Sequence, residues 1–280
     1  MPFQPLENFI KFKTLAAAAA LALAAPAFAT ILPPTNAAGQ LNPGDNTELF
    51  LVVQDSTAKV SFTYDLGVTL GGFIATEATA PLKLDFNVAA DANWDSFRSV
   101  ADTTKSVWAV IAMDSIGGTG ANANRILTTV KSGTENLLAN MSNTQLSTGI
   151  GAAQGGQFYG SINATGTHKT QVNGSSVNFQ TDNGFGYFGK SGGLTPNFNN
   201  NAPFVSTNAI GTDSSLFLLT RSSSSAGAKV IVNQFDTLQP LVVSFDGSML
   251  QVSAVPELGT YALMLAGLLA VGSLARRRRG

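Results

Sequence analysis

The sequence predicts a mainly β domain, an antiparallel β-sandwich or jelly roll with one or two short helices, between an N-terminal signal peptide and a C-terminal transmembrane helix. Apolar and polar residues alternate in several short segments, turn residues separate these segments, and both ends carry an uncharged apolar run. A period of two is typical of strands with one buried face. Closely spaced strands of this kind indicate an antiparallel sandwich or jelly roll.

Residues 1–29 have the three parts of a secretory signal peptide. Two lysines precede the apolar stretch 15–25, and a small-x-small cleavage site follows it. The stretch is about 11 residues long, too short to span a bilayer, which needs roughly 20. We therefore expect cleavage at a site formed by Ala27, Ala29 and Thr30, with Thr30 as the first mature residue.

Residues 30–254 form the predicted β-rich domain. Apolar and polar residues alternate in 59–64 and 82–88, whereas 49–53 and 107–113 are continuous apolar runs, which are typical of strands buried on both faces. Later strands are expected at 216–220, 229–235, 241–245 and 249–252. The Asp246-Gly247 pair between the last two predicts a hairpin turn.

Two segments predict helices. Ser132 and Glu135 have the spacing of a capping box, and apolar residues follow at helical intervals through Leu146. Trp94 and Phe97 share one face of a second, shorter helix. We expect both helices to pack over the edge of the sheet.

Segment 171–212 is rich in Asn, Gly and Ser and carries six aromatic residues. This composition predicts long loops, with one hairpin at 185–188. The aromatic side chains are expected to belong to the core, although an aromatic platform for sugar rings is the alternative.

The C-terminal segment 255–280 has the order of a sorting and anchoring signal. Its Pro-Glu turn precedes 18 uncharged residues, 258–275, and four arginines. A helix of this length spans roughly 27 Å, close to the hydrocarbon thickness. By the positive-inside rule, the arginines place the preceding domain on the far side of the membrane. The residues of this signal are Val255, Pro256, Glu257, Arg276, Arg277, Arg278 and Arg279.

This order resembles the PEP-CTERM sorting signal, which is carried by exported proteins of Gram-negative bacteria that make extracellular polysaccharide. The resemblance covers about 26 residues at the end of the chain. It implies that a membrane protease-transpeptidase, an exosortase, recognises the Pro-Glu turn and removes the tail. The family has proline after the glutamate, and this chain has Leu258 instead. A permanently tail-anchored periplasmic protein is therefore the alternative fate.

Charge and cysteine content exclude several classes. Residues 30–256 carry 10 basic and 15 acidic side chains, a net charge of −5. A domain without a basic excess is not expected to bind nucleic acid. The absence of cysteine excludes thiol nucleophiles, cysteine metal sites and disulfides.

Motifs for catalysis are missing from the sequence. His168, the single histidine, lies in a Gly-Thr-His-Lys-Thr turn, where we expect a solvated side chain rather than a catalytic base. There is no Gly-x-Ser-x-Gly elbow and no phosphate-binding glycine loop. We expect a protein that is not an enzyme and has no cofactor. A glycosidase carboxylate pair leaves no spacing signature, so an exported polysaccharide-acting enzyme is the alternative.

A weak calcium loop is the one metal-like pattern. It places oxygen ligands at alternate positions, but serine stands where the sharp turn needs glycine. The competing interpretation is an Asp-capped helix start with buried aromatic residues. We expect no metal, and the weak candidates are Asp91, Asn93, Asp95 and Asp102.

Together these patterns predict a non-catalytic cell-surface or extracellular-matrix protein. It would act in adhesion, in the matrix of a biofilm or floc, or in association with polysaccharide. Its expected partners are the export translocon, signal peptidase, an exosortase-type protease and extracellular polysaccharide. It would be anchored transiently in the inner membrane and finally reach the cell surface or the medium.

Overall fold

The computed structural model describes most of the predicted domain, namely residues 30–33, 47–79, 82–115, 124–155, 157–171, 173–182, 184–235 and 241–254. Its strands are β1 Glu48–Asp55, β2 Val60–Thr69, β3 Lys83–Asn87, β4 Val107–Ser115, β5 Asn124–Thr129, β6 Ser175–Phe179, β7 Asn208–Ala209, β8 Ser214–Thr220, β9 Ile231–Gln234, β10 Leu241–Phe245 and β11 Met249–Ala254. Its helices are α1 Leu70–Glu77, α2 Ala92–Arg98, α3 Asn143–Gly155 and α4 Phe158–Asn163, with 3-10 turns Val88–Ala90, Glu135–Asn140 and Gly184–Gly186.

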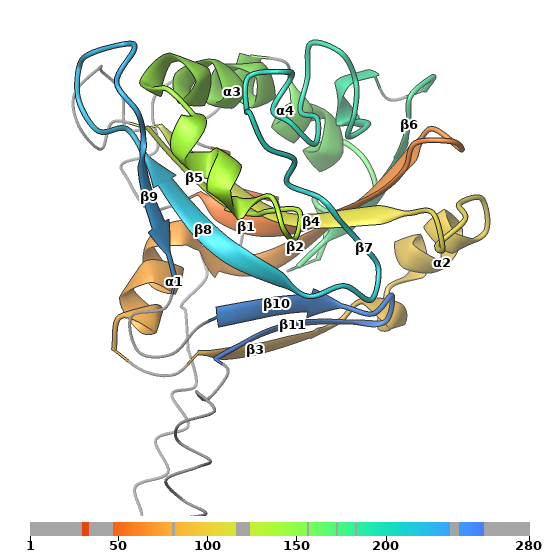
Figure 1. Ribbon diagram of the computed structural model, residues 1–280. Coiled ribbons are helices and arrows are strands. Elements are labelled where there is room, and N and C mark those ends of the chain that lie inside the picture. The colour runs from red at the N-terminus through yellow and green to blue at the C-terminus, as the bar shows by residue number, and fades with distance from the viewer. Residues whose placement is uncertain are drawn as a thin grey trace, which may run out of the picture.

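The described strands pair antiparallel in one 11-stranded sheet, which confirms the mainly β, antiparallel prediction. The order is β3-β11-β10-β8-β5-β4-β1-β2-β6, with β7 on β4 and β9 on β8. One edge of β8 is shared, because Ser214 and Ser215 pair with β10 whereas 217–220 pair with β9. The strands β10, β11 and β3 therefore diverge from β9 and lie below the rest of the sheet (Figure 1). The architecture is one curled sheet rather than the two separate sheets of a sandwich or jelly roll.

A core lies on each side of the central strands. In β1, Leu49, Leu51 and Val53 face a core shared with β10, β11, α1 and α2. Phe50 and Val52 face a second core, which α3 and α4 cover from above in Figure 1. The continuous apolar run of β1 is thus buried on both faces, as predicted.

The polar face of β2 differs from the prediction, because it is also buried. Ser61 and Thr63 are fully buried although they alternate with apolar residues. The segment containing Phe188 lies over Ser61, since the Phe188 backbone N–H donates to Ser61 Oγ over 3.0 Å. By contrast, β3 at the sheet edge keeps one exposed face, and the β10–β11 hairpin turns at Asp246 as expected.

The capping box of α3 lies ten residues after the predicted one. Ser142 Oγ accepts from the Gln145 backbone N–H over 3.3 Å, and Gln145 Oε1 accepts from the Ser142 N–H over 2.9 Å. Ser132 donates to the Asp213 carbonyl instead. The predicted helix is therefore split into a 3-10 turn and α3.

Ser142→Ala is expected to lower the free energy of unfolding by about 1 kcal/mol, because it removes this cap. Urea denaturation measures the change. Thr148→Ala is the matched control, since Thr148 donates its hydroxyl to the Thr144 carbonyl within the same helix; such a bond adds little stability. Equal losses in the two variants would contradict a capping role for Ser142.

Segment 171–212 consists largely of loops, as predicted, but it contains β6 and the two-residue strand β7, which the sequence analysis missed. The expected hairpin at 185–188 is wrong, since the chain there forms a 3-10 turn followed by a bend. Four of the six aromatic residues are buried in the structure: Tyr187, Phe188, Phe198 and Phe204. The core interpretation of these rings is therefore correct.

Candidate functional site

Most of the predicted processing residues lie outside the described part of the chain. These are Ala27, Ala29, Val255, Pro256, Glu257, Arg276, Arg277, Arg278 and Arg279. None of the helices within the described ranges is long and apolar enough to cross a membrane. Segments 1–29 and 258–275 fall outside those ranges, so the signal peptide and the transmembrane helix stay predictions.

The residues next to these signals are well anchored in the domain. Thr30 is half-buried, and Ile31 is fully buried in the core beneath α4. At the other end β11 ends at Ala254, whose backbone N–H donates to the Leu82 carbonyl over 3.0 Å. The folded domain thus occupies the interval between the two predicted signals.

Asn163 at the end of α4 holds the first residues of the domain. Its Oδ1 accepts from the Ile31 backbone N–H over 3.0 Å, and its Nδ2 donates to the Ile31 carbonyl over 2.9 Å. On the other side, Leu32 donates its N–H to Glu48 Oε2 over 2.8 Å and accepts from the Glu48 N–H over 3.3 Å. We call this set (Ile31, Leu32, Glu48 and Asn163) the N-terminal clamp.

Two buried carboxyl groups lie at this clamp. Glu48 is 7% exposed and Asp65 on the neighbouring strand is 2% exposed. Burial, together with the negative charge of Asp65, raises the pKa of Glu48 to about 7. Burial raises the pKa of Asp65 to about 6, although its carboxylate accepts from the Gly67 N–H over 2.8 Å.

Raised carboxyl pKa values are also a feature of general acids in enzymes. The enzyme alternative, however, requires such groups in a cleft that a polysaccharide can enter. Glu48 and Asp65 instead face the clamp and the core. The negative charge of Asp65 opposes ionisation of Glu48, so the two groups are not expected to be ionised together at neutral pH.

The calcium candidates are engaged in contacts with the protein itself: Asp91 accepts from Ser175 Oγ over 2.8 Å, and Asn93 Nδ2 donates to the same oxygen over 2.9 Å. Asp91 caps α2, where its Oδ1 accepts from the Asn93 N–H over 2.7 Å. Asp95 pairs with Arg98, and Asp102 pairs with Lys105 over 3.1 Å. Within the described residues, no group of three or more His, Asp or Glu side chains is placed to hold a metal ion. The helix-cap interpretation describes this segment, with Trp94 and Phe97 both fully buried as it expected.

His168 is not the solvated loop residue that the sequence analysis expected. Its side chain is fully buried, and neither ring nitrogen has a hydrogen-bond partner. Burial lowers its pKa to about 4. The chain is close-packed here, since a Cβ placed on Gly174 would lie 2.5 Å from His168 Cα. The imidazole is therefore a neutral core group.

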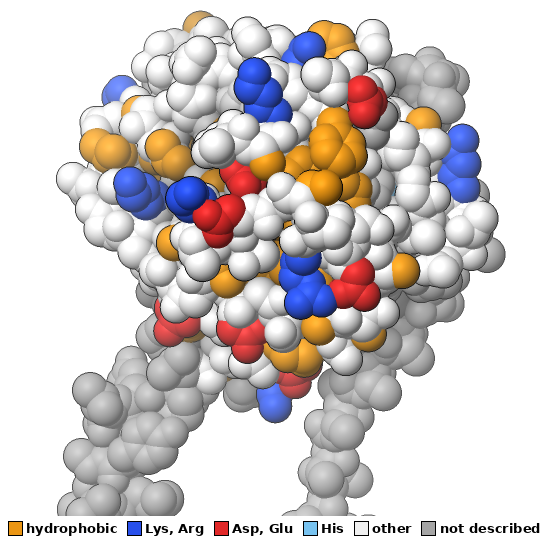
Figure 2. Space-filling model, turned by 90° about the vertical axis from the view of Figure 1, so that its right-hand side faces the viewer, with side chains coloured by type: hydrophobic (Ala, Val, Ile, Leu, Met, Phe, Trp, Pro, Cys, Tyr) orange, Lys and Arg blue, Asp and Glu red, His pale blue; other side chains and the backbone are white. Residues whose placement is uncertain are grey.

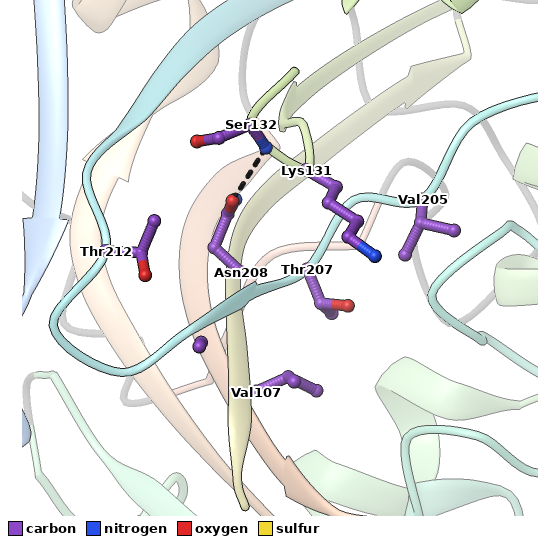
Figure 3. Close-up of a pocket in the computed structure, with 8 residues that line it drawn as sticks. Val107, Lys131, Ser132, Val205, Thr207, Asn208 and Thr212 are labelled. Carbon is purple, nitrogen blue, oxygen red and sulfur yellow. Dashed lines mark hydrogen bonds between the residues drawn. The ribbon is translucent and has the colours of Figure 1, made fainter. Parts of the chain in front are cut away.

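A pocket of about 350 Å³ opens beside β7 (Figure 3). Asn208 braces its wall by accepting from the Ser132 N–H over 2.9 Å and donating to the Val130 carbonyl over 3.0 Å. The described lining has no aromatic ring and no carboxylate, so it lacks a platform for sugar stacking and a hydrolytic pair. The other lining residues are Val107, Lys131, Val205, Thr207, Ala209 and Thr212.

Charges of both signs are present over the described part of the face in Figure 2. Lysine and arginine side chains lie among acidic and uncharged polar side chains over the described part of this face, and two of them are neighbours at its left, next to an acidic side chain. A mixed surface of this kind gives no uniform field to steer a polyanion.

Sequence reasoning missed Glu48, Asp65 and Asn163. Each residue is unremarkable in its local sequence, and the clamp depends on contacts over 16 and 132 positions along the chain. A possible signal was Glu48 directly before an apolar strand, because a carboxylate rarely begins a strand that is buried on both faces.

Comparisons with known proteins identify no relative of this chain. No protein-family model, no curated protein and no solved structure matches this chain.

Proposed function

We propose that this chain is an exported, non-catalytic cell-surface or matrix protein. In this proposal a signal peptide is removed after Ala29, and an exosortase-type protease removes the tail at the Pro256-Glu257 turn. The domain 30–254 would then act in adhesion or in association with extracellular polysaccharide. The tail would cross the membrane as a helix at 258–275.

The strongest support for this proposal is where the packed domain begins and ends relative to the two predicted signals. Ile31, two residues after the expected cleavage site, is fully buried, and β11 ends at Ala254, directly before the expected sorting turn. Both signals can therefore be removed without cutting into the core. The packing of an extensive two-sided core without cysteine is also consistent with an extracellular β domain that relies on burial for its stability.

The burial of the aromatic rings limits how the domain could bind a glycan. Since Tyr187, Phe188, Phe198 and Phe204 are inside, a stacking platform built from them is not available to a glycan. Contacts through surface hydroxyl and amide groups, or self-association, fit the domain better.

Intact-mass measurement of the cell-associated and released protein is the direct test of processing. We expect a first residue of Thr30 and loss of the residues after about 256, since the tail is expected to be cut there. Pro256→Ala and Glu257→Ala together should leave the tail uncut and reduce release at least tenfold.

Retention of Arg276 through Arg279 in the native protein would show a permanent tail anchor instead. The matched control is Glu135→Gln, a change within the domain that leaves both signals intact. If the control lost release as well, the effect of the turn variant would reflect folding rather than recognition.

A further inference from the structure

Strand β3 forms one end of the sheet and lies at its lower border in Figure 1. Among the described strands it pairs only with β11, so the backbone groups along its other edge have no strand partner there. An edge of this kind is a template for pairing with another chain. No residue of β3 is fully buried, whereas every residue of β1 in the interior of the sheet is buried. The described part of the chain therefore leaves this edge open.

The charged residues of β3 direct their backbone groups to this free edge. The Ala254 N–H of β11 donates to the Leu82 carbonyl over 3.0 Å, which turns Leu82 towards β11. Backbone groups of successive residues in a strand point to opposite edges. Leu84 therefore also binds β11, whereas Lys83 and Asp85 point their N–H and carbonyl groups away from it.

The side chains of β3 separate charge and apolar area onto opposite faces. Leu84 and Phe86 pack against the core shared with β10, β11, α1 and α2. Lys83 and Asp85 lie on the other face, where Nζ and Oδ2 are 3.3 Å apart and the two side chains are 71% and 38% exposed. Asp85 also accepts from Gln251 Nε2 of β11 over 3.0 Å. The backbone groups at the free edge thus belong to residues whose charges are exposed beside it.

This spacing of charges makes the edge complementary to itself. A two-fold axis perpendicular to the sheet makes two adjoining β3 strands antiparallel. With the axis level with Leu84, Lys83 of each copy lies directly opposite Asp85 of the other, and both residues have the outward backbone groups that a hydrogen-bonded pair requires. With the axis level with Asp85, two carboxylates would lie opposite each other, which is unfavourable. Charge therefore favours the register centred on Leu84.

We propose that two copies of this chain associate through their β3 edges, with Lys83 of each copy opposite Asp85 of the other. Each such pair exchanges both of its N–H···O=C bonds, which joins the two sheets. On the opposite face Leu84 meets Leu84 of the second copy, and Phe86 meets Leu82, so the exposed parts of these apolar side chains are covered. The interface is small, and its association is therefore weak and reversible. This pairing depends on neither export nor cleavage of the chain.

Charge reversal on each side of the pair tests this register. Lys83→Glu places an acid opposite Asp85, and Asp85→Lys places a base opposite Lys83. Each variant alone should therefore have a dimer dissociation constant about tenfold or more above that of the native chain. An equimolar mixture of the two variants should recover association, since every cross-strand pair in the mixed dimer has opposite charges. Sedimentation equilibrium from about 10 μM to about 1 mM, the range expected for a small interface, measures these constants.

Lys105→Glu is the matched control, because Lys105 forms a similarly exposed ion pair with Asp102 over 3.1 Å. It should leave the dissociation constant unchanged. All samples are produced from the full-length gene, and intact mass reports their processing separately; association through the tail would be equal in every variant. A native chain that stays monomeric, equal association of Lys83→Glu and the native chain, or a mixture no stronger than its components would overturn the pairing, whatever the mass shows.

Discussion

Replacing His168 with phenylalanine is expected to remove about 3 kcal/mol of acid sensitivity between pH 6.5 and pH 4. Burial without a hydrogen-bond partner lowers the pKa of His168 to about 4 from an ordinary 6.5. In this pH range the unfolded chain therefore binds a proton at His168, whereas the folded chain does not. Stability from the neutral imidazole is complete above pH 6.5 and is lost as the pH falls towards 4.

Glu48 and Asp65 act in the opposite direction. Their pKa values are raised to about 7 and about 6, so the folded chain holds protons that the unfolded chain releases. Their contribution is complete at low pH and is lost as the pH rises through 4.5 and towards 7. The native chain shows the sum of both effects, so only the difference between native and variant isolates His168.

Urea denaturation from pH 4 to pH 8 measures this difference. His168→Phe puts no titratable or unpaired polar atom at this buried position, so relative to its own stability at pH 8 it should lose about 3 kcal/mol less than the native chain on acidification to pH 4. His168→Gln should remove the same pH dependence but be less stable at every pH, because it buries an unpaired amide. Since His168 is the only histidine, one imidazole NMR signal also reports its pKa. Parallel stability curves for native protein and His168→Phe, or a pKa near 6.5, would contradict this account.

Strands were predictable where the pattern depends on local chemistry. The alternation at 82–88 lies in an edge strand whose outer face meets water, so its polar residues are exposed as expected. The same alternation in β2 was misleading, because a loop far along the chain covers Ser61. Alternation in the sequence shows which residues of a strand can face a core. Whether another segment also covers the polar face depends on tertiary packing.

The cap of α3 shows a second limit of prediction from sequence. Ser132-x-x-Glu135 and Ser142-x-x-Gln145 are equivalent as capping boxes, and only the second pair forms the reciprocal bonds. The choice depends on Ser132, whose hydroxyl is bound to the Asp213 carbonyl. The clamp is a further case, since Asn163 on α4 binds Ile31 and Glu48 on β1 binds Leu32. Such long-range contacts leave no spacing in the sequence.

Trp94→Ala is expected to lower the free energy of unfolding by about 3–5 kcal/mol, one of the largest losses for a single change in this domain. Trp94 comes from α2, and its ring lies 5.1 Å from that of Phe62 on β2 and 5.5 Å from that of Phe245 on β10. It therefore joins the central strands to the lower, curled part of the sheet. Its removal leaves a cavity at the point where the two parts meet.

Trp94→Phe should cost far less, for two reasons. Phenylalanine keeps most of the ring contacts, and the indole N–H of Trp94 is buried without a hydrogen-bond partner, so no bond is lost. Trp108→Phe is the matched comparison, since Trp108 is also fully buried but donates its indole N–H to the Ala209 carbonyl over 3.0 Å. We expect Trp108→Phe to cost about 1 kcal/mol more than Trp94→Phe.

Guanidinium denaturation followed by circular dichroism measures all three variants without relying on tryptophan fluorescence. The expected order of stability loss is Trp94→Ala, then Trp108→Phe, then Trp94→Phe. If Trp94→Phe were as costly as Trp94→Ala, the indole nitrogen would have to matter to the fold, contrary to its unpaired state. If instead Trp94→Ala were mild, the curled strands β10, β11 and β3 would be held by their pairing with β8 rather than by the aromatic cluster. The two residue pairs that join β8 to β10 are a narrow connection, and we therefore expect the cluster to carry most of the stability of this part of the sheet.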